Sequence, residues 1–286
     1  MKAKVICAVV ALFLAGWMAG TARADFTLYG DEQLTVNTSH GQGVLWDQSC
    51  ATIVPGGAVY SIDAYNSSTV CMSGGAPFSL YALSAYDTST VVITGGETWS
   101  LYALSVYNSS TVAMSGGSVY SLHASDSSTV AMSGGEMYAL QAWNSTTVDM
   151  SDGSVYVLQA WNSTTVDMSD GSVSTIDARD SSTVDISGGS MCYLRVYNTS
   201  TVTFDGQDFL LGTGLSLNGD RVLGTGILSG EWFDGTPWTV NITANDFTAT
   251  ILAIPEPGTL SLLVLLALSL PKRGGLALRR KSGYGG

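Results

Sequence analysis

The stretch Ser154–Gly171, SVYVLQAWNSTTVDMSDG, matches the preceding eighteen residues, Glu136–Gly153, at 15 of 18 positions. Looser copies extend from Gly56 to Gly206, and most close on a Gly-Gly or Asp-Gly pair at spacings of 18 or 21 residues. Repetition at a short fixed period is typical of a solenoid. The consensus S-V-Y-x-L-x-A-(Y/W)-(N/D)-S-(S/T)-T-V-x-M-S-G-G contains two β-prone pieces, one Asn/Asp-Ser turn and one glycine turn. We therefore predict an all-β fold: a parallel, right-handed β-solenoid with one coil per repeat.

Alternation assigns the two faces of the second β-prone piece. Val112 and Met114 point to one side, and Thr111 and Ala113 point to the other. The apolar columns recur in every copy, so we expect them to stack into one continuous core that a single unit is too small to bury. The Asn or Asp after the aromatic position is expected to be a turn residue in the left-handed region.

The chain divides into five expected segments. They are a signal peptide (1–24), an N-terminal cap with an imperfect first coil (25–55), the solenoid repeats (56–206), a small antiparallel C-terminal cap (207–253) and a sorting tail (254–286). A basic start, an apolar run and Ala22-Arg23-Ala24 predict an exported chain cleaved after Ala24. Caps are expected because open solenoid ends expose unpaired strand edges.

The tail carries a specific motif. Pro255, Glu256 and Pro257 precede the apolar run LSLLVLLALSL and then a cluster of Lys and Arg. This order resembles the PEP-CTERM sorting tail of bacteria that produce exopolysaccharide. The resemblance implies an exosortase-type processing enzyme as partner, transient anchoring in the membrane, and delivery to the cell surface or extracellular matrix. An apolar run followed by basic residues is independently typical of a stop-transfer segment. The run from Leu260 to Leu270 is shorter than the roughly 20 residues that span a bilayer.

The net charge restricts the classes of partner that the chain is expected to bind. Between Asp25 and Ala253 there are 22 acidic residues and three basic ones, so the net charge of this span is −19. Such a surface repels phosphate, which argues against nucleic-acid and nucleotide partners.

Cys50, Cys71 and Cys192 remain after cleavage, an odd number in columns that do not match, and we expect no disulfide among them.

One aromatic column is a candidate surface for glycan contacts. It consists of the aromatic residue before each Asn/Asp turn: Tyr65, Tyr86, Tyr107, Trp143, Trp161 and Tyr197. Rings in line on a rod suit stacking against sugars. In the interpretation that we favour, each ring instead packs on its neighbours one coil away, at ~0.5–1.5 kcal/mol per pair. Ser125 and Arg179 are expected to break the column.

Two other columns have simpler interpretations. A Thr begins each second strand, but the next outward position varies, so β-propensity explains the column better than ice binding does. Asp149, Asp152, Asp167, Asp170 and Asp185 cluster on consecutive coils and suit calcium, yet the nonapeptide calcium motif is missing and a solvated acidic face is favoured.

The sequence offers little for catalysis. Arg179 beside Asp177 and Asp180 is the one suggestive cluster, and His40 and His123 lack partners at informative spacing. We expect a non-enzymatic structural or adhesive protein without a cofactor, within or against secreted polysaccharide such as a biofilm matrix. The alternatives are a polysaccharide lyase or hydrolase, or a glycan-binding module, on the same scaffold.

Overall fold

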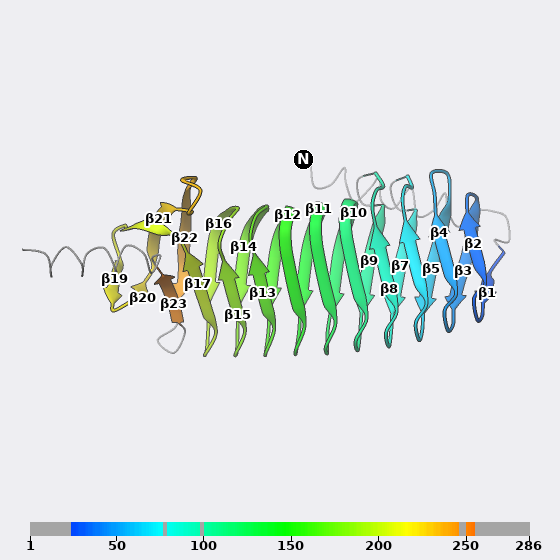
Figure 1. Cartoon of the computed structure of the whole chain (residues 1–286), viewed down its shortest axis with the longest axis horizontal. Coiled ribbons are helices and arrows are strands. Elements are labelled where there is room, and N and C mark those ends of the chain that lie inside the picture. The colour runs from blue at the N-terminus through cyan, green and yellow to red at the C-terminus, as the bar shows by residue number, and fades with distance from the viewer. Residues whose placement is uncertain (1–23, 77–78, 98–99, 246–249, 255–286) are drawn as a thin grey trace, which may run out of the picture. The chain divides into compact units, whose positions relative to one another are not determined.

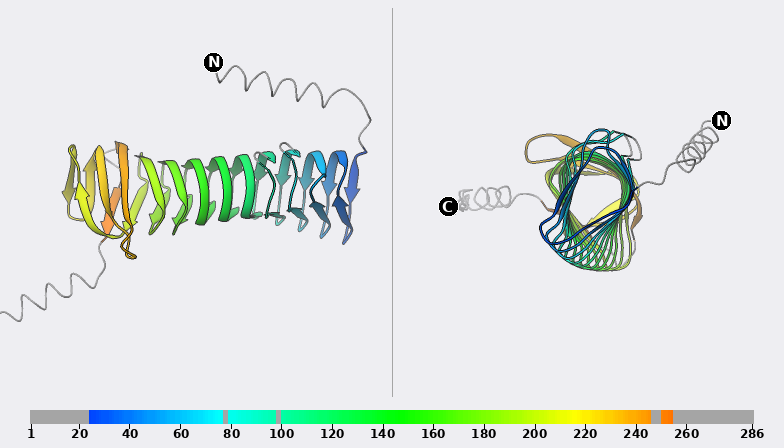
Figure 2. Two further views of the ribbon diagram at one scale, coloured as in Figure 1. Left: turned by 90° about the horizontal axis from the view of Figure 1, so that it is seen from above. Right: turned by 90° about the vertical axis from the view of Figure 1, so that its right-hand side faces the viewer.

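The computed structural model describes residues 24–76, 79–97, 100–245 and 250–254, and over these residues the chain is built from strands. The strands wind into about ten stacked parallel turns (Figure 1). This confirms the predicted parallel β-solenoid. Seen end-on, successive coils superpose closely (Figure 2).

Toward both ends of the array, the two β-prone pieces of a coil form separate strands. Those of the V-Y-x-L-x-A piece are β3 (Ser39–Leu45), β5 (Ala58–Ala64), β7 (Leu80–Ala85), β9 (Leu101–Val106), β14 (Ser172–Ala178) and β16 (Ser190–Val196). Those of the T-V-x-M piece are β2 (Gln33–Val36), β4 (Cys50–Ile53), β6 (Thr69–Met72), β8 (Thr90–Ile93), β13 (Thr165–Met168), β15 (Thr183–Ile186) and β17 (Thr201–Asp205).

In the middle of the array, one strand includes both pieces. These strands are β10 (Thr111–Ala124), β11 (Thr129–Ala142) and β12 (Thr147–Ala160). The glycine pair therefore bends the strand here rather than ending it, as the register shifts between Met114 and Ser118 show. Gly135 and Gly153 have φ of 90° and 99°, a conformation that strains residues with a Cβ, and a Cβ on Gly135 would also lie 2.9 Å from the backbone of Gly116, so this bend favours glycine.

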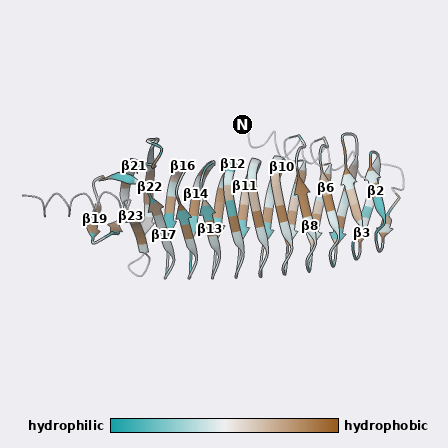
Figure 3. Cartoon of the chain, in the orientation of Figure 1, coloured by the Kyte–Doolittle hydropathy of each residue, from teal (hydrophilic) through white to brown (hydrophobic). Residues whose placement is uncertain are grey.

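Adjacent coils pair in register, residue on equivalent residue. Val112 aligns with Val130, and Val130 with Val148, and the Met and Leu columns align in the same way. The predicted apolar columns are buried and form one core along the described coils. Figure 3 shows the same pattern as apolar bands that recur from coil to coil.

The Asn/Asp turn has the expected conformation. Residues in this column, such as Asn144 and Asn162, have φ near +60°. Two residues further on, a buried Ser or Thr closes the turn: the Thr146 hydroxyl donates to Trp143 O at 2.7 Å, and the Thr164 hydroxyl donates to Trp161 O at 2.7 Å.

Both ends differ in detail from the expected caps. At the N-terminus, β1 (Phe26–Leu28) already pairs in parallel with β3, so coils begin within the segment expected to contain a cap. At the C-terminus, β18 (Gln207–Leu211), β19 (Leu215–Asn218), β20 (Arg221–Gly224) and β21 (Gly226–Glu231) form the expected antiparallel pairings. The following β22 (Pro237–Asn245) and β23 (Thr250–Ile254) return to pair in parallel with β16 and β17, adding a further coil.

The segments expected to direct sorting lie outside the described residues. These are the signal peptide up to Arg23 and the tail with Pro255, Glu256 and Pro257. Among the residues that the structure does describe, there is no helix of the length and apolarity needed to cross a bilayer.

Candidate functional site

The predicted aromatic column lies at the corner that leads into the Asn/Asp turn. Ring centroids are 5.0 Å apart for Tyr65 and Tyr86, and 4.6 Å apart for Trp143 and Trp161, with interplanar angles of 8° and 3°. Trp46, one coil before the aligned repeats, adds a ring 4.4 Å from Tyr65. Interior rings therefore have neighbours on both faces, at separations too small to admit a sugar. This arrangement agrees with the packing interpretation.

Arg179 continues the column, contrary to the expectation that it breaks it. Its guanidinium carbon lies 4.5 Å from the ring centroid of Trp161 and 4.7 Å from that of Tyr197. A planar cation stacks between two aromatic faces much as a ring does. Arg179 and Arg195 also lie 3.7 and 3.6 Å from Asp177 Oδ2, whose side chain is 4% exposed. The pair of arginines thus compensates a buried carboxylate.

The column does change character at Ser125. No ring stands there, and His123 lies between the flanking rings, with centroids 6.2 Å from Tyr107 and 6.1 Å from Trp143. His40 packs edge-on against Phe26, with centroids 5.5 Å apart. Both histidines of the chain therefore take part in aromatic packing.

A second aromatic column, which the sequence reasoning missed, runs along the V-Y-x-L-x-A strands. We call it the tyrosine ladder: Tyr60, Tyr81, Tyr102, Tyr120, Tyr138 and Tyr156. Successive centroids are 4.9–5.3 Å apart and the interplanar angles are 16° or less. Tyr138 and Tyr156 are 45% and 54% exposed. The ladder is the most regular exposed aromatic feature of the described coils.

The ladder was missed because strict alternation fails at this point of the coil. Val119 and Leu122 are both buried, and the two residues between them, Tyr120 and Ser121, are half-buried. A simple alternating strand would place Tyr120 on the same side as Leu122. The signal available in the sequence was the tyrosine itself, at one fixed position in six consecutive copies.

The ladder presents hydroxyl groups as well as rings. Burial, and then the neighbouring phenols of Tyr120 and Tyr81, raise the pKa of Tyr102 above its usual 10.0. Its phenol therefore stays protonated in neutral solution and can both donate and accept hydrogen bonds.

The described aspartates form an acidic column on consecutive coils, but their carboxylates do not form a set of metal ligands. Asp149, Asp167 and Asp185 align in register on β12, β13 and β15. Burial, followed by repulsion from Asp185 and Asp149, raises the pKa of Asp167 above 3.8. Within the described ranges, no group of three or more His, Cys, Asp or Glu residues has a geometry that could hold a metal ion.

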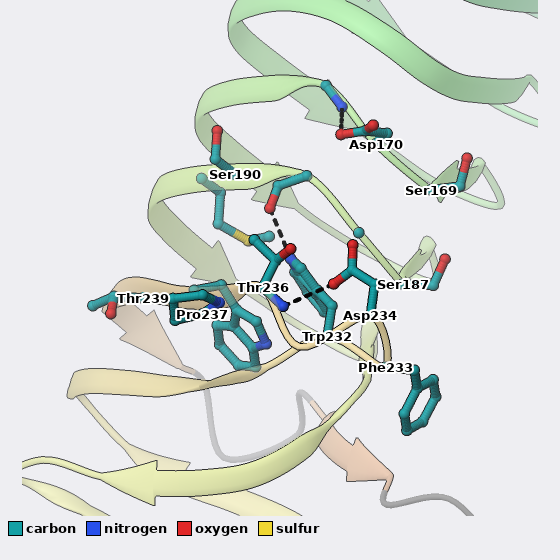
Figure 4. A pocket seen from close by; sticks show the side chains of 15 residues that line it. Ser169, Asp170, Ser187, Ser190, Trp232, Phe233, Asp234, Thr236, Pro237 and Thr239 are labelled. Atoms are coloured by element: carbon teal, nitrogen blue, oxygen red, sulfur yellow. Dashed lines mark hydrogen bonds between the residues drawn. The ribbon is translucent and has the colours of Figure 1, made fainter.

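A cleft of about 570 Å³ lies between the glycine corners of β13–β16 and the loop that joins β21 to β22 (Figure 4). The Trp232 indole donates to Gly189 O at 2.9 Å and fixes this loop to the coil. Asp234 Oδ1 accepts from Thr236 N at 2.8 Å, which is the main reason why the pKa of Asp234 is lowered. Asp170 Oδ1 likewise accepts from Gly171 N at 2.7 Å. Both carboxylates of the cleft therefore stabilise their own turns.

The cluster considered for catalysis is engaged in similar contacts. Arg179 is clamped between rings, and Asp180 Oδ1 accepts from Asn198 Nδ2 at 2.7 Å. Arg179 and Asp180 thus take part in contacts between neighbouring coils. The described cysteines Cys50, Cys71 and Cys192 are free thiols, and burial, followed by the proximity of Cys50, raises the pKa of the Cys71 thiol.

Comparisons with protein-family models, with curated proteins and with solved structures find no match to this chain. The class of protein is therefore defined by the fold and surface alone. It is a parallel β-solenoid with two stacked aromatic columns and an acidic exterior. These features, together with the sequence motifs at the two ends, are the basis for the proposals below.

Proposed function

We propose that this chain is an exported, non-enzymatic structural and adhesive protein of a bacterial cell surface or exopolysaccharide matrix. A signal-peptide pattern and a PEP-CTERM-like tail with Pro255-Glu256-Pro257 support export and sorting by an exosortase-type enzyme. In this proposal the apolar tail segment holds the chain in the membrane until it is processed.

The observation that carries the structural role is the register of the coils. Equivalent residues stack coil on coil, so turn, ring and core contacts are repeated along the whole array. A repeated scaffold of this kind offers extended surfaces to a partner. The net charge of −19 between Asp25 and Ala253 favours neutral partners over anionic ones.

The proposed sorting is tested by fractionating the bacterium that encodes the chain and locating the full-length protein and its variants. We expect the wild-type protein in the surface and matrix fractions, and a Glu256→Ala variant to accumulate in the membrane fraction with its tail uncleaved. Glu231→Ala, a change of the same type in the body of the protein, is the control. Equal processing of wild type and Glu256→Ala would contradict the proposed sorting.

The matrix role is tested separately with the mature protein. We expect retention on the bacterium's own exopolysaccharide and no release of sugar products during prolonged incubation. Product release would favour the alternative of a polysaccharide lyase or hydrolase. Absence of retention would contradict an adhesive role.

A further inference from the structure

The tyrosine ladder has an open end at Tyr156. Val155 pairs with Val173, and Val157 pairs with Thr175, so the residue one coil beyond Tyr156 is Ser174. One face of the Tyr156 ring is covered by Tyr138, at a centroid distance of 5.2 Å. Among the described residues, no ring packs against the face toward Ser174, and Tyr156 is 54% exposed, compared with 45% for Tyr138. Unlike the interior rings, Tyr156 can stack with a ligand.

A groove of about 340 Å³ lies beside this open end. Its walls include Tyr138, Tyr156 and Ser174, and a column of small polar residues runs along it. In that column Ser118 pairs with Glu136, Glu136 with Ser154, and Ser154 with Ser172. The side chains of Met137 and Val155 are buried beneath it. One aromatic face therefore adjoins a row of hydroxyls and a carboxylate, spaced one coil apart.

The charge of the groove restricts its ligand. Among the described residues that line it, Glu136 is the one ionisable group besides the two phenols, and none is a Lys or Arg. An anionic sugar, phosphate or sulfate would meet a carboxylate without a compensating cation. A neutral pyranose has an apolar C–H face for the ring and hydroxyls that can donate to Glu136 and exchange hydrogen bonds with serines. Aromatic walls with a few placed polar groups are typical of small-molecule sites.

The spacing of the coils also indicates how a polysaccharide would lie along the groove. Successive rungs of the ladder and of the serine column are separated by one coil, close to 5 Å along the tyrosines. An extended chain of β-1,4-linked pyranoses advances by a similar length per sugar. A polysaccharide laid along the coils would thus present one set of hydroxyls to each rung of the groove.

We propose that Tyr156, with Ser154, Ser172, Ser174 and Glu136, binds one neutral pyranose of an extended polysaccharide, stacked on the open face of Tyr156. This site rests on the proposed matrix function and gives it a location, distinct from the Tyr65–Tyr197 column. It holds the ligand without chemical change.

The experiment measures binding of uncharged hexasaccharides to the mature full-length protein by calorimetry. Cellohexaose, laminarihexaose and mannohexaose are the neutral probes, and a hexamer of galacturonate is the anionic probe. We expect at least one neutral probe to bind and the galacturonate to bind at least about tenfold more weakly. Failure of all three neutral probes, or preference for galacturonate, would overturn the proposal.

Three variants locate the site. Tyr156→Ala removes the ring, and Ser174→Tyr adds a further rung that covers the open face; each should weaken binding of the neutral probe about tenfold or more. Tyr60→Ala is the matched control at the opposite end of the ladder, where the flanking position is Ala58 rather than serine, and it should leave binding within about twofold.

Ser174→Tyr also separates binding from folding. Because the added tyrosine extends a stack already present, the melting temperature of this variant should not fall below that of wild type. If the ladder had only a structural role, the variant would bind the neutral probe as wild type does. Unchanged binding in Ser174→Tyr, or an equal loss in Tyr60→Ala, would refute the site. Matrix retention that persists in both Tyr156→Ala and Ser174→Tyr would leave the proposed function standing and reject this site alone.

Discussion

At the scale of single residues, the Asn/Asp turn shows why the column contains two residue types. Each Asn amide donates to the side-chain oxygen one coil earlier: Asn66 to Asp47 at 3.1 Å, Asn144 to Asp126 at 3.3 Å and Asn162 to Asn144 at 3.0 Å. No two Asp residues are adjacent among the described members from Asp47 to Asn198. At least one Asn thus stands between successive Asp residues and supplies a hydrogen-bond donor between carboxylates that would otherwise repel each other.

Asn162→Ala tests this turn. At φ 57° a side chain with a Cβ and no local hydrogen bond costs about 1–2 kcal/mol, and the hydrogen bond from the Asn162 amide to Asn144 is also lost. We expect a lower urea midpoint for Asn162→Ala, and a smaller loss for Asn162→Gly, which tolerates the backbone but lacks the amide. Asn162→Asp would stand next to Asp180 and should lose stability at neutral pH. An alanine variant as stable as the glycine variant would contradict the role of the left-handed turn.

At the scale of elements, each outward column has its own balance of packing and charge. Each stacked pair in the two aromatic columns gains dispersion energy, and Arg179 allows one of the columns to pass a position without a ring. The acidic column on β12, β13 and β15 instead stacks like charges, and burial, followed by this repulsion, raises the pKa of Asp167. The ionised form of Asp167 is therefore disfavoured in the folded chain.

Asp167→Asn should relieve this cost. Because the folded pKa lies above the unfolded one, the destabilisation is fully present above the folded pKa and disappears as pH falls through it toward values below 3.8. We expect a higher melting temperature than wild type at pH 7 and no difference near pH 3. Asp31→Asn removes the same charge from an exposed turn outside the column and should change little. A gain that persists near pH 3 would mean that the ionised carboxylate of Asp167 is not its cause.

The sequence is sufficient for the elements that depend on local periodicity. Coil length, core columns and the left-handed turn all follow from residues within one repeat, because each repeat meets a copy of itself. Features that depend on departures from the repeat were not foreseen. Tyr120 escapes the core because two residues, not one, separate the buried Val119 and Leu122, and β22 rejoins the solenoid although its sequence lacks the consensus. The Tyr156 groove depends on a single serine, Ser174, replacing a tyrosine, which matters only once the ladder is known.

At the scale of the whole described unit, stability is a sum of similar coils and their interfaces rather than of one globular core. Equivalent residues of β10, β11 and β12 occupy the same positions in successive coils, so the interface above a coil resembles the interface below it. The exceptions are the ends, where β22 and β23 follow an antiparallel excursion and complete a further coil. The middle coils should therefore be interchangeable, whereas the terminal ones should not.

Deletion of Glu136–Gly153 tests this modularity. The deletion joins Gly135 to Ser154 and so keeps the same glycine bend. Ser154–Ala160 then takes the place of Glu136–Ala142 beside the second half of β10, in an equivalent register. We expect a folded protein with an unchanged far-UV dichroism spectrum per residue and a rod shorter by one strand spacing, ~4.8 Å, in solution scattering. Deleting only the first nine of these residues, Glu136–Asn144, would place half a coil out of register and direct core side chains toward solvent, so this variant should not fold cooperatively. If the eighteen-residue deletion were as disruptive as the nine-residue one, the coils would not be independent units. The stability of the solenoid would then depend on contacts specific to that coil, such as the Trp143–Trp161 pair.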